Sequence, residues 1–383
     1  MTMTQKKILN DFGNRVVAWQ KKHGRHDLPW QNTQDPYAVW LSEIMLQQTQ
    51  VVTVRDYFAR FMQRFPTVTD LAKAHEDEVL GLWSGLGYYS RARNLHKAAQ
   101  QVVALHGGHF PKDAQTLQTL PGIGPSTAAA VASLCFGEAV AILDGNVKRV
   151  LTRVLGFGED LSQARHEKAL WSLAESLLPQ RDIDRYTQGL MDLGAQVCTA
   201  RQPRCGLCPL RSDCVAHAQE RPHDFPVKTK RTRRGRRVSV LWWLQHRDEV
   251  WLVQRPAPGV WAGLWCLPER PVQDPQELGI PPAATPSLGA WADAVKREQL
   301  SPIEHALTHF DWLLLPVRFT LPSKFSLARR QHMQLAFEAD LAADLAADHV
   351  VAEGAPKSGQ WCTIGEALAL GLPAPVRKLL ESA

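Results

Sequence analysis

The chain has 383 residues, a formal net charge of +6 and 45% hydrophobic residues. Its length exceeds that of one typical domain, and its apolar content supports packed cores and argues against a disordered protein. The modest basic excess is compatible with a polyanionic partner but does not require one.

Neither a secretion signal nor a membrane span is evident. The first residues, Met1–Lys7, contain no apolar signal core. The longest apolar stretch, Ala128–Leu143, is interrupted by Glu138 and is too short to cross a bilayer. We therefore expect a soluble, intracellular protein with no membrane partner.

From about residue 5 to residue 218, apolar residues recur at intervals of three and four, which predicts helices. Asp35 followed by Pro36 is a typical helix start, and Asp113 predicts another. Residues 219–238 predict a linker, and seven of the ten residues from Lys228 to Arg237 are Lys or Arg. This run is either a solvated connector or a strip that contacts phosphates.

Beyond the linker the pattern changes to strands. Val238–Gln245 and Val250–Arg255, separated by the turn His246–Glu249, predict a β-hairpin. We therefore expect a multidomain protein in which an all-α region, residues 1–218, precedes an α+β domain, residues 239–383.

Four cysteines are clustered with the spacing C-x6-C-x2-C-x5-C, at Cys198, Cys205, Cys208 and Cys214. Thiolates so close in sequence can converge on one metal centre, and they suit both zinc and iron–sulfur chemistry. Four unrelated buried cysteines are the alternative. Arg201, Arg204 and Arg211 lie among these cysteines and could contact a DNA backbone. The spacing leaves the choice between zinc and iron–sulfur open.

Residues Leu120–Ala128, LPGIGPSTA, lie between two helical stretches. Gly122 and Gly124 permit a tight turn that tolerates left-handed backbone. Their N–H groups, together with the N-terminus of the next helix, could bind a phosphate without reading sequence. A plain connector between two helices is the alternative.

Two carboxylates are candidates for acid–base chemistry. Asp144 follows an apolar segment at a predicted helix N-terminus, a position that favours its ionised form. Glu43 has mostly apolar helical neighbours, which should raise its pKa. A turn-forming aspartate and a solvated glutamate are the respective alternatives. A proton donor beside an ionised partner is the pairing that cleavage of a glycosidic bond requires.

These motifs together resemble the helix-hairpin-helix DNA glycosylase superfamily, and within it the MutY-type adenine DNA glycosylases. The resemblance is carried by Leu41–Gln50, Gly85–Arg93 and Leu143–Arg149, in addition to the hairpin and the cysteines. It implies a six-helix module at about residues 29–139 and an iron–sulfur module formed by residues 1–28 and 140–218, which holds a [4Fe–4S] cluster.

The resemblance also implies the reaction. Members of the family flip adenine mispaired with 8-oxoguanine or guanine out of duplex DNA and hydrolyse its N-glycosidic bond. Glu43 would protonate adenine N7, and Asp144 would stabilise the oxocarbenium ion or a covalent intermediate. The implied DNA-binding residues are Gly122, Gly124, Ser126, Gln48, Leu86, Tyr88, Asn146 and Lys148. The implied adenine pocket consists of Leu28, Trp30, Val51 and Gln188.

Endonuclease III, a relative with the same hairpin and cluster, has a Schiff-base lysine where this chain has Ser126. It also lacks the counterpart of Glu43 and the C-terminal domain. We therefore expect monofunctional hydrolysis, with Lys148 able to attack an exposed sugar aldehyde only weakly. An endonuclease III-like glycosylase and lyase acting on oxidised pyrimidines, and a non-catalytic lesion-binding protein, are the alternatives.

The C-terminal domain resembles a MutT-type (Nudix-like) fold over Val250–Pro256 and Gly259–Pro268. The following Glu269–Pro275 lacks the clustered glutamates of a magnesium-dependent pyrophosphatase, so we expect this domain to bind and not to hydrolyse. The family reads 8-oxoguanine with a Phe-Ser-His loop, which is Leu307-Thr308-His309 here. Thr308 and His309 would recognise the opposite base. We expect a cytoplasmic monomer, associated with the nucleoid if the chain is bacterial.

Overall fold

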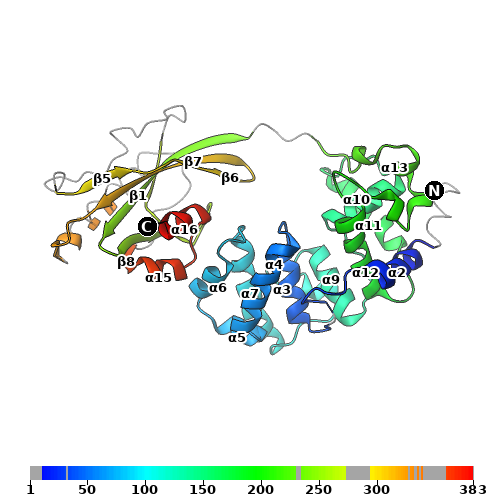
Figure 1. The fold of residues 1–383 in the computed structure, drawn as a ribbon. Helices are drawn as coiled ribbons and strands as arrows, with labels where there is room; N and C mark the ends of the chain where they lie inside the picture. Colours follow the sequence, from blue (N-terminus) through cyan, green and yellow to red (C-terminus); the bar gives the residue numbers. More distant parts are fainter. Residues whose placement is uncertain are drawn as a thin grey trace. The chain divides into compact units, whose positions relative to one another are not determined.

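The computed structural model describes residues 11–31, 33–229, 234–272, 294–326, 328–331, 334–335, 338–339 and 359–382. The chain divides into two compact units (Figure 1). The first consists of Met1–Lys73 and Asn94–Arg231, and the second of Ala74–Arg93 and Thr232–Ala383. Across the described ranges, no helix combines the length and the apolar character that a membrane span needs.

The first unit is helical. Its α-helices are α2 (Phe12–His23), α3 (Pro36–Leu46), α4 (Val51–Arg64), α5 (Val68–Lys73), α7 (Ser90–His106, which begins in the second unit), α8 (Ala114–Leu117), α9 (Pro125–Phe136), α10 (Gly145–Leu155), α11 (Ala164–Ser176), α12 (Ile183–Asp192) and α13 (Val215–Ala218). Its short helical turns are η1 (Leu193–Val197), η2 (Cys205–Leu207), η3 (Arg211–Asp213) and η4 (Pro222–Asp224).

Both predicted helix starts are confirmed. The Asp35 carboxylate accepts a hydrogen bond from Tyr37 N at 3.0 Å, and Pro36 is the first residue of α3. The Asp113 carboxylate accepts one from Thr116 N at 2.7 Å at the start of the short helix α8. In each case a side chain satisfies a backbone N–H that has no partner within the helix.

A hydrophobic core in this unit joins α2, α9, α10 and α12, and its members include Phe12, Val16, Val150 and Leu190. Helices α2 and α12 lie side by side (Figure 1). A Cβ atom at Gly189 of α12 would come within 2.8 Å of Val16 Cγ1, so glycine permits this close approach. The core therefore fixes α12 and α10, the two helices that carry several of the candidate site residues.

Among its described residues, the second unit contains an eight-stranded sheet with the central order β3-β2-β1-β7-β5. Its strands are β1 (Gly235–His246), β2 (Glu249–Gln254), β3 (Trp265–Cys266), β4 (Glu269–Pro271), β5 (Lys296–Gln299), β6 (Ile303–Ala306), β7 (Phe310–Thr320) and β8 (Gly359–Thr363). Its helices are α6 (Glu76–Trp83), α15 (Ile364–Ala369) and α16 (Ala374–Glu381).

Strands β1 and β2 form the predicted antiparallel hairpin, with Gln245 opposite Val250. Strand β1 begins at Gly235, inside the segment predicted as a linker, and residues 230–233 of that segment lie outside the described residues. Residues 273–275 of the predicted Glu269–Pro275 segment also lie outside them.

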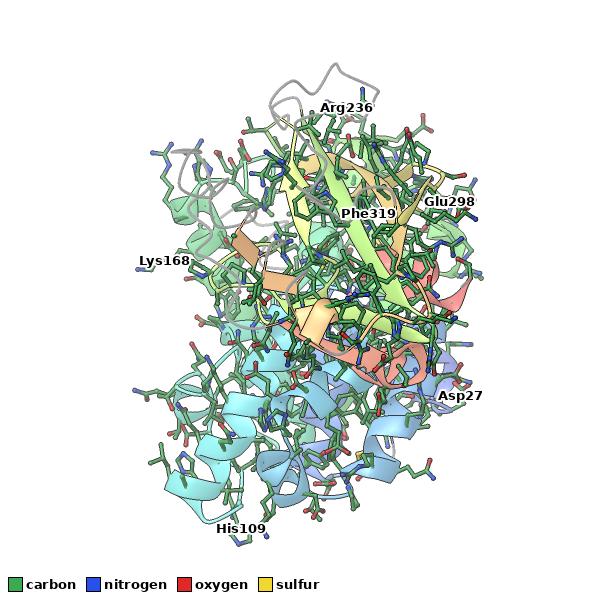
Figure 2. All side chains as sticks on the ribbon, turned by 90° about the vertical axis from the view of Figure 1, so that its left-hand side faces the viewer. Asp27, His109, Lys168, Arg236, Glu298 and Phe319 are labelled. Carbon is green, nitrogen blue, oxygen red and sulfur yellow. The ribbon has the colours of Figure 1, made fainter. Side chains whose placement is uncertain are left out.

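The sheet is buried on both faces. Trp242 of β1 and Phe319 of β7 belong to one core, whereas Trp243 belongs to the other together with residues of α15 and α16. Adjacent β1 side chains point to opposite faces, so the run of apolar residues in β1 serves both cores. Figure 2 shows Phe319 within this unit, with the charged Arg236 and Glu298 at its surface.

Residues 74–93, which the sequence analysis assigned to the helical region, pack with the second unit instead. Tyr89 OH donates to the carbonyl of Leu372 at 2.7 Å, and Ser84 Oγ donates to the same carbonyl at 3.1 Å. A Cβ atom at Gly81 would lie 2.4 Å from the Ala369 carbonyl oxygen, so the backbones are in close contact. Tyr88 therefore belongs to the same compact unit as the C-terminal sheet.

Candidate active site and nucleic-acid interface

Glu43 lies on helix α3, among side chains that are mostly buried. The pKa of the Glu43 carboxyl is raised to about 7: burial is the largest cause, the negative charge of Asp144 adds to it, and the positive charge of Arg25 opposes both effects. The expected raised pKa is confirmed. Such a carboxyl can hold a proton near neutral pH and give it to a leaving group.

Asp144 caps helix α10. Its Oδ1 accepts from Val147 N at 2.7 Å, and its Oδ2 lies 3.4 Å from Asn146 Nδ2. These hydrogen bonds lower the pKa of Asp144, but burial has the larger effect and raises it overall. The hydrogen bonds at the helix N-terminus favour the ionised form, as expected, and desolvation outweighs them in the net shift. Asp144 is nevertheless close enough to Glu43 for its charge to act there, which sequence alone could not establish.

Arg149 connects the start of α10 to Cys198, the first of the four cysteines, through hydrogen bonds. Its Nη2 donates to Asn146 Oδ1 at 2.8 Å and to the Gly194 carbonyl at 2.6 Å. Its Nε donates to the Cys198 carbonyl at 2.7 Å. The π-helical turn η1 brings Gly194 so close that a Cβ atom there would lie 2.4 Å from Asn146 Cβ. Asp144, Asn146 and the cysteine loop thus form one connected structure.

Two of the residues predicted to form the adenine pocket are apolar and buried. Leu28 and Trp30 are buried, and the Trp30 ring packs edge-on against Phe58 with centroids 5.3 Å apart. Val51, the first residue of α4, and Gln188 of α12 are partly buried. Gln188 is therefore a polar group in this set that could read a base.

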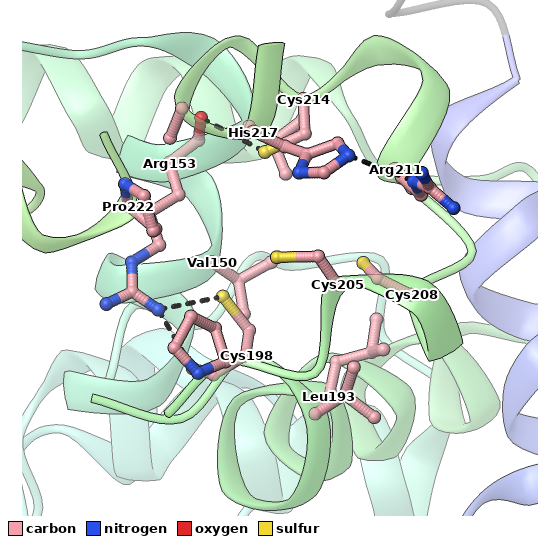
Figure 3. Close-up of a pocket in the computed structure, with 14 residues that line it drawn as sticks. Val150, Arg153, Leu193, Cys198, Cys205, Cys208, Arg211, Cys214, His217 and Pro222 are labelled. Carbon is pink, nitrogen blue, oxygen red and sulfur yellow. Dashed lines mark hydrogen bonds between the residues drawn. The ribbon is translucent and has the colours of Figure 1, made fainter. Parts of the chain in front are cut away.

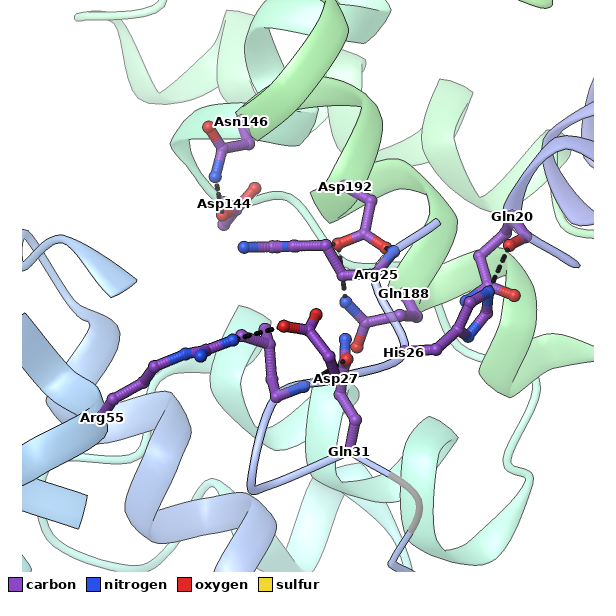
Figure 4. A network of polar contacts seen from close by, with 11 residues as sticks. Gln20, Arg25, His26, Asp27, Gln31, Arg55, Asp144, Asn146, Gln188 and Asp192 are labelled. Atoms are coloured by element: carbon purple, nitrogen blue, oxygen red, sulfur yellow. Dashed lines mark hydrogen bonds and ion pairs between the residues drawn. The ribbon is translucent and has the colours of Figure 1, made fainter. Parts of the chain in front are cut away.

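Sequence reasoning missed two charged residues beside Gln188. Asp192, one turn later on α12, is completely buried and accepts from Gln188 Nε2 at 3.0 Å. Arg25 Nε donates to Asp192 Oδ1 at 2.6 Å, and Arg25 N donates to Oδ2 at 2.9 Å (Figure 4). The spacing of four between Gln188 and Asp192 was the available signal, since it places both on one helix face.

A third missed residue, Gln31, follows the pocket residues in the same loop. Its Oε1 lies 3.4 Å from Leu28 N, and its Nε2 is buried without a hydrogen-bond partner among the described residues. An unused donor beside Leu28 and Trp30 suits a site that binds a polar ligand.

The helix-hairpin-helix element runs from α8 to α9. Gly122 has a φ of 75°, and a Cβ atom there would lie 2.7 Å from Asn94 Cβ, so glycine is required. Gly124 caps α9 with ordinary extended backbone, and the space around it is open. Only the first glycine therefore uses the left-handed region. Ser126 Oγ accepts from Leu143 N at 3.2 Å, which joins the hairpin to the residue before Asp144.

Two residues predicted to insert into DNA have left-handed backbone. The φ angles are 58° at Gln48 and 49° at Tyr88, which is uncommon for residues other than glycine and occurs preferentially at functional sites. The Tyr88 side chain is 47% exposed, as insertion into a duplex requires. Leu86 is buried in contrast, so its side chain would have to emerge before it could touch DNA.

Lys148 lies one turn after Asp144, and its Nζ forms an ion pair with Glu167 Oε1 at 2.5 Å. In the second unit, Thr308 and His309 occupy the turn between β6 and β7. Thr308 Oγ1 lies 3.1 Å from Tyr88 OH, a hydrogen bond in which either oxygen can donate. The predicted opposite-base residue and the predicted inserting residue are therefore in direct contact.

The four clustered cysteines line one pocket, which is partly open to solvent (Figure 3). Apolar side chains, among them Val150 and Leu193, form much of its wall. Arg153 Nη1 lies 3.4 Å from Cys198 Sγ and would offset thiolate charge. Considering only the described residues, no group of three or more His, Cys, Asp or Glu side chains is arranged to hold a metal ion. Four sulfurs around an apolar-walled cavity fit a polynuclear cluster.

Three family models match successive parts of the chain. Residues 41–176 match the HhH-GPD superfamily of base excision DNA repair proteins. Residues 198–214 match the iron–sulfur binding domain of endonuclease III, and residues 239–382 match the NUDIX domain. The matched order agrees with the expected fold class.

Several proteins resemble the chain. It is 33% identical to the adenine DNA glycosylase of Buchnera aphidicola subsp. Acyrthosiphon pisum over 376 residues, which cover 97% of each chain. It is 36% identical to the human adenine DNA glycosylase over 355 residues, covering 78% of this chain and 65% of the human one. Among solved structures, a thermostable thymine-DNA glycosylase aligns with a TM-score of 0.51 at 30% identity, over 56% of this chain and 99% of that one.

Proposed function

This chain belongs to the MutY-type adenine DNA glycosylases of base excision repair, and we propose that it removes adenine mispaired with 8-oxoguanine or guanine by monofunctional hydrolysis. In this reaction the N9–C1′ bond breaks, adenine leaves with a proton, and water supplies the new oxygen at C1′. The observation that carries the proposal is the electrostatic coupling of two partly buried carboxyl groups, Glu43 and Asp144.

Glu43 supplies the proton. A pKa of about 7 leaves a large fraction of the carboxyl protonated at neutral pH, and protonation of adenine N7 makes the base a better leaving group. Arg25 keeps this pKa from rising further, so the acid can still release its proton.

Asp144 stabilises the positive charge that develops on the sugar, either as a counter-ion to the oxocarbenium ion or as a covalent partner at C1′. Its hydrogen bonds to Val147 N and to Asn146 hold the carboxylate in one orientation. An orientation fixed before the reaction avoids the cost of reorganising the site as charge develops.

The DNA backbone is bound by the hairpin and by neighbouring polar groups. Open space around the Gly124 cap of α9 lets a phosphate approach the N–H groups at that helix N-terminus. The other proposed phosphate contacts are near this helix N-terminus or near Asp144 in the sequence: Ser126, Asn146 and Lys148. Gln48 and Tyr88 enter the duplex, and the adenine is received against Leu28, Trp30, Val51 and Gln188.

Cys198, Cys205, Cys208 and Cys214 hold the [4Fe–4S] cluster of the proposal, in preference to zinc. The cluster, when bound, crosslinks the loop between α12 and α13. Support comes from the cavity between the four sulfurs and from the Arg153 guanidinium beside Cys198. A visible absorption spectrum together with iron and sulfide analysis separates a cluster from zinc.

In the second unit, Thr308 and His309 recognise 8-oxoguanine, the base opposite the adenine. Their place in the turn between β6 and β7, where His309 is exposed and the partly buried Thr308 contacts Tyr88, supports this role.

The decisive experiment uses a duplex with adenine opposite 8-oxoguanine. We expect release of free adenine and an intact abasic strand that breaks only on alkaline treatment. The Glu43→Gln variant should lose at least about 100-fold in excision rate while binding the duplex normally, because it removes the proton donor at nearly constant volume. A wild-type protein that carries its cluster and releases no adenine would contradict the proposal.

A further inference from the structure

Gln188 is the polar residue of the proposed adenine pocket. Its side-chain amide can adopt two orientations that exchange the positions of its oxygen and its nitrogen. A glutamine amide has an oxygen that accepts and a nitrogen that donates, so its orientation decides which base edge it can bind. A neighbour that fixes the amide would therefore determine base selectivity.

Asp192 is such a neighbour. It is completely buried, and a carboxylate can only accept hydrogen bonds. Asp192 Oδ1 receives Gln188 Nε2 at 3.0 Å, so the amide must turn its nitrogen toward α12. Gln188 Oε1 then has no hydrogen-bond partner within the described part of the chain and remains free to accept.

Arg25 holds Asp192 in place. Its Nε and its backbone N occupy different oxygens of the carboxylate, at 2.6 and 2.9 Å, so the carboxylate cannot rotate without losing one of them. The Arg25 side chain is 17% exposed, and its charge also acts on Glu43, which places this group beside the proposed catalytic acid. Three donors thus converge on one buried carboxylate (Figure 4).

We infer that Asp192, anchored by Arg25, is a positioning residue that turns the Gln188 carbonyl oxygen toward the extruded base and so selects purines with an exocyclic amino group at C6. Adenine offers an N–H donor at this position, whereas hypoxanthine offers a carbonyl oxygen. The inference rests on the proposed placement of Gln188 in the adenine pocket and adds the group that sets its orientation.

The test compares single-turnover excision of three bases opposite 8-oxoguanine: adenine, purine with hydrogen at C6, and hypoxanthine. Asp192→Leu removes the acceptor at similar volume and frees the amide to rotate. Relative to wild type, we expect its rate on adenine to fall about tenfold more than its rate on purine, and the hypoxanthine-to-adenine ratio to rise. Gln188→Leu should change the adenine-to-purine ratio by the same factor as Asp192→Leu does. The double variant should show the same ratio as either single variant.

Each ratio is measured within one preparation, so partial unfolding affects all substrates alike. If Asp192→Leu does not fold, Asp192→Ala serves, because it removes both acceptor oxygens without adding bulk, and the adenine-to-purine ratio should fall as for Asp192→Leu. Asp184→Asn is the matched control, since Asp184 lies exposed on the same helix and pairs with Arg185 at 3.7 Å.

An equal loss on adenine and purine, with an unchanged ratio, overturns the inference while leaving the proposed function intact. A wild-type protein that releases none of the three bases overturns the proposed function itself.

Discussion

The chemistry of Glu43 depends on opposing charges around one partly buried carboxyl. Burial and Asp144 raise its pKa, Arg25 opposes them, and the net value is about 7. Because Glu43, the proposed general acid, must be protonated to act, the rate of excision should be high below this value and fall as pH rises through it. The pKa of the group therefore predicts the alkaline limb of the activity profile.

The Arg25→Gln variant tests whether the charge of Arg25 determines the pH at which this alkaline limb falls. Removing the positive charge should raise the Glu43 pKa and move the alkaline limb to higher pH, whereas Arg25→Lys, which keeps the charge, should leave it nearly unchanged. The measurement is single-turnover adenine release from about pH 5 to about pH 9. If the alkaline limb of Arg25→Gln falls at the same pH as that of the wild type, a group other than Glu43 is responsible for the limb.

The same carboxyl should make the folded protein less stable at high pH. Its pKa in the folded state lies above the model value of 4.5, so the folded state binds this proton more tightly than the unfolded chain does. Stability is therefore lost progressively as pH rises from about 4.5 through about 7.

The Glu43→Gln variant should not show this loss of stability at high pH. Its free energy of unfolding should exceed that of the wild type by about 2 kcal/mol at about pH 8, somewhat less than the full shift implies because the side chain is partly exposed. The two proteins should be equal below about pH 4.5. Urea unfolding at both pH values measures the difference, and a variant that is less stable at high pH contradicts it.

Among the elements, the turn η1 determines how α10 and the cysteine loop meet. Gly194 lies within this turn against Asn146, and no side chain fits between them. Gly194→Ala should push the turn away from α10, lower the free energy of unfolding by about 2 kcal/mol and slow excision, because Asn146 and with it Asp144 are displaced.

Gly206→Ala is the control for that change. It lies in the same cysteine loop, with open space where its Cβ atom would be, and should alter stability by less than about 0.5 kcal/mol. Thermal unfolding of both variants at equal iron content compares them directly. Equal effects from the two substitutions would mean that the contact with Asn146 is unimportant.

Local chemistry explains which elements were predictable. Asp35, Asp113 and Asp144 each cap the helix that follows, and the strand pattern after Val238 gives the correct hairpin. The ion pair of Arg25 with Asp192 joins residues 167 positions apart, so no local pattern encodes it. The direction of the Asp144 pKa shift depended on burial, which the sequence around the cap does not reveal.

In the molecule as a whole, the division into units also escaped prediction. Residues 74–93 have the helical pattern of their neighbours, yet their buried hydrogen bonds go to Leu372, nearly 300 residues later. Such long-range partners are chosen by tertiary packing. This placement bears on the proposed function, because Tyr88 belongs to the unit that carries Thr308.

That attachment predicts how the opposite base is read. Thr308→Val and Tyr88→Phe each remove the 3.1 Å hydrogen bond between the two side chains, and either change should lower the preference for 8-oxoguanine over guanine opposite adenine by about threefold to tenfold. Because both substitutions break one contact, the double variant should lose little more than either single one. Thr320→Val, at the far end of β7, is the control. Excision rates on the two duplexes give the preference, and additive losses would show that Tyr88 and Thr308 act separately, each through its own contact with DNA.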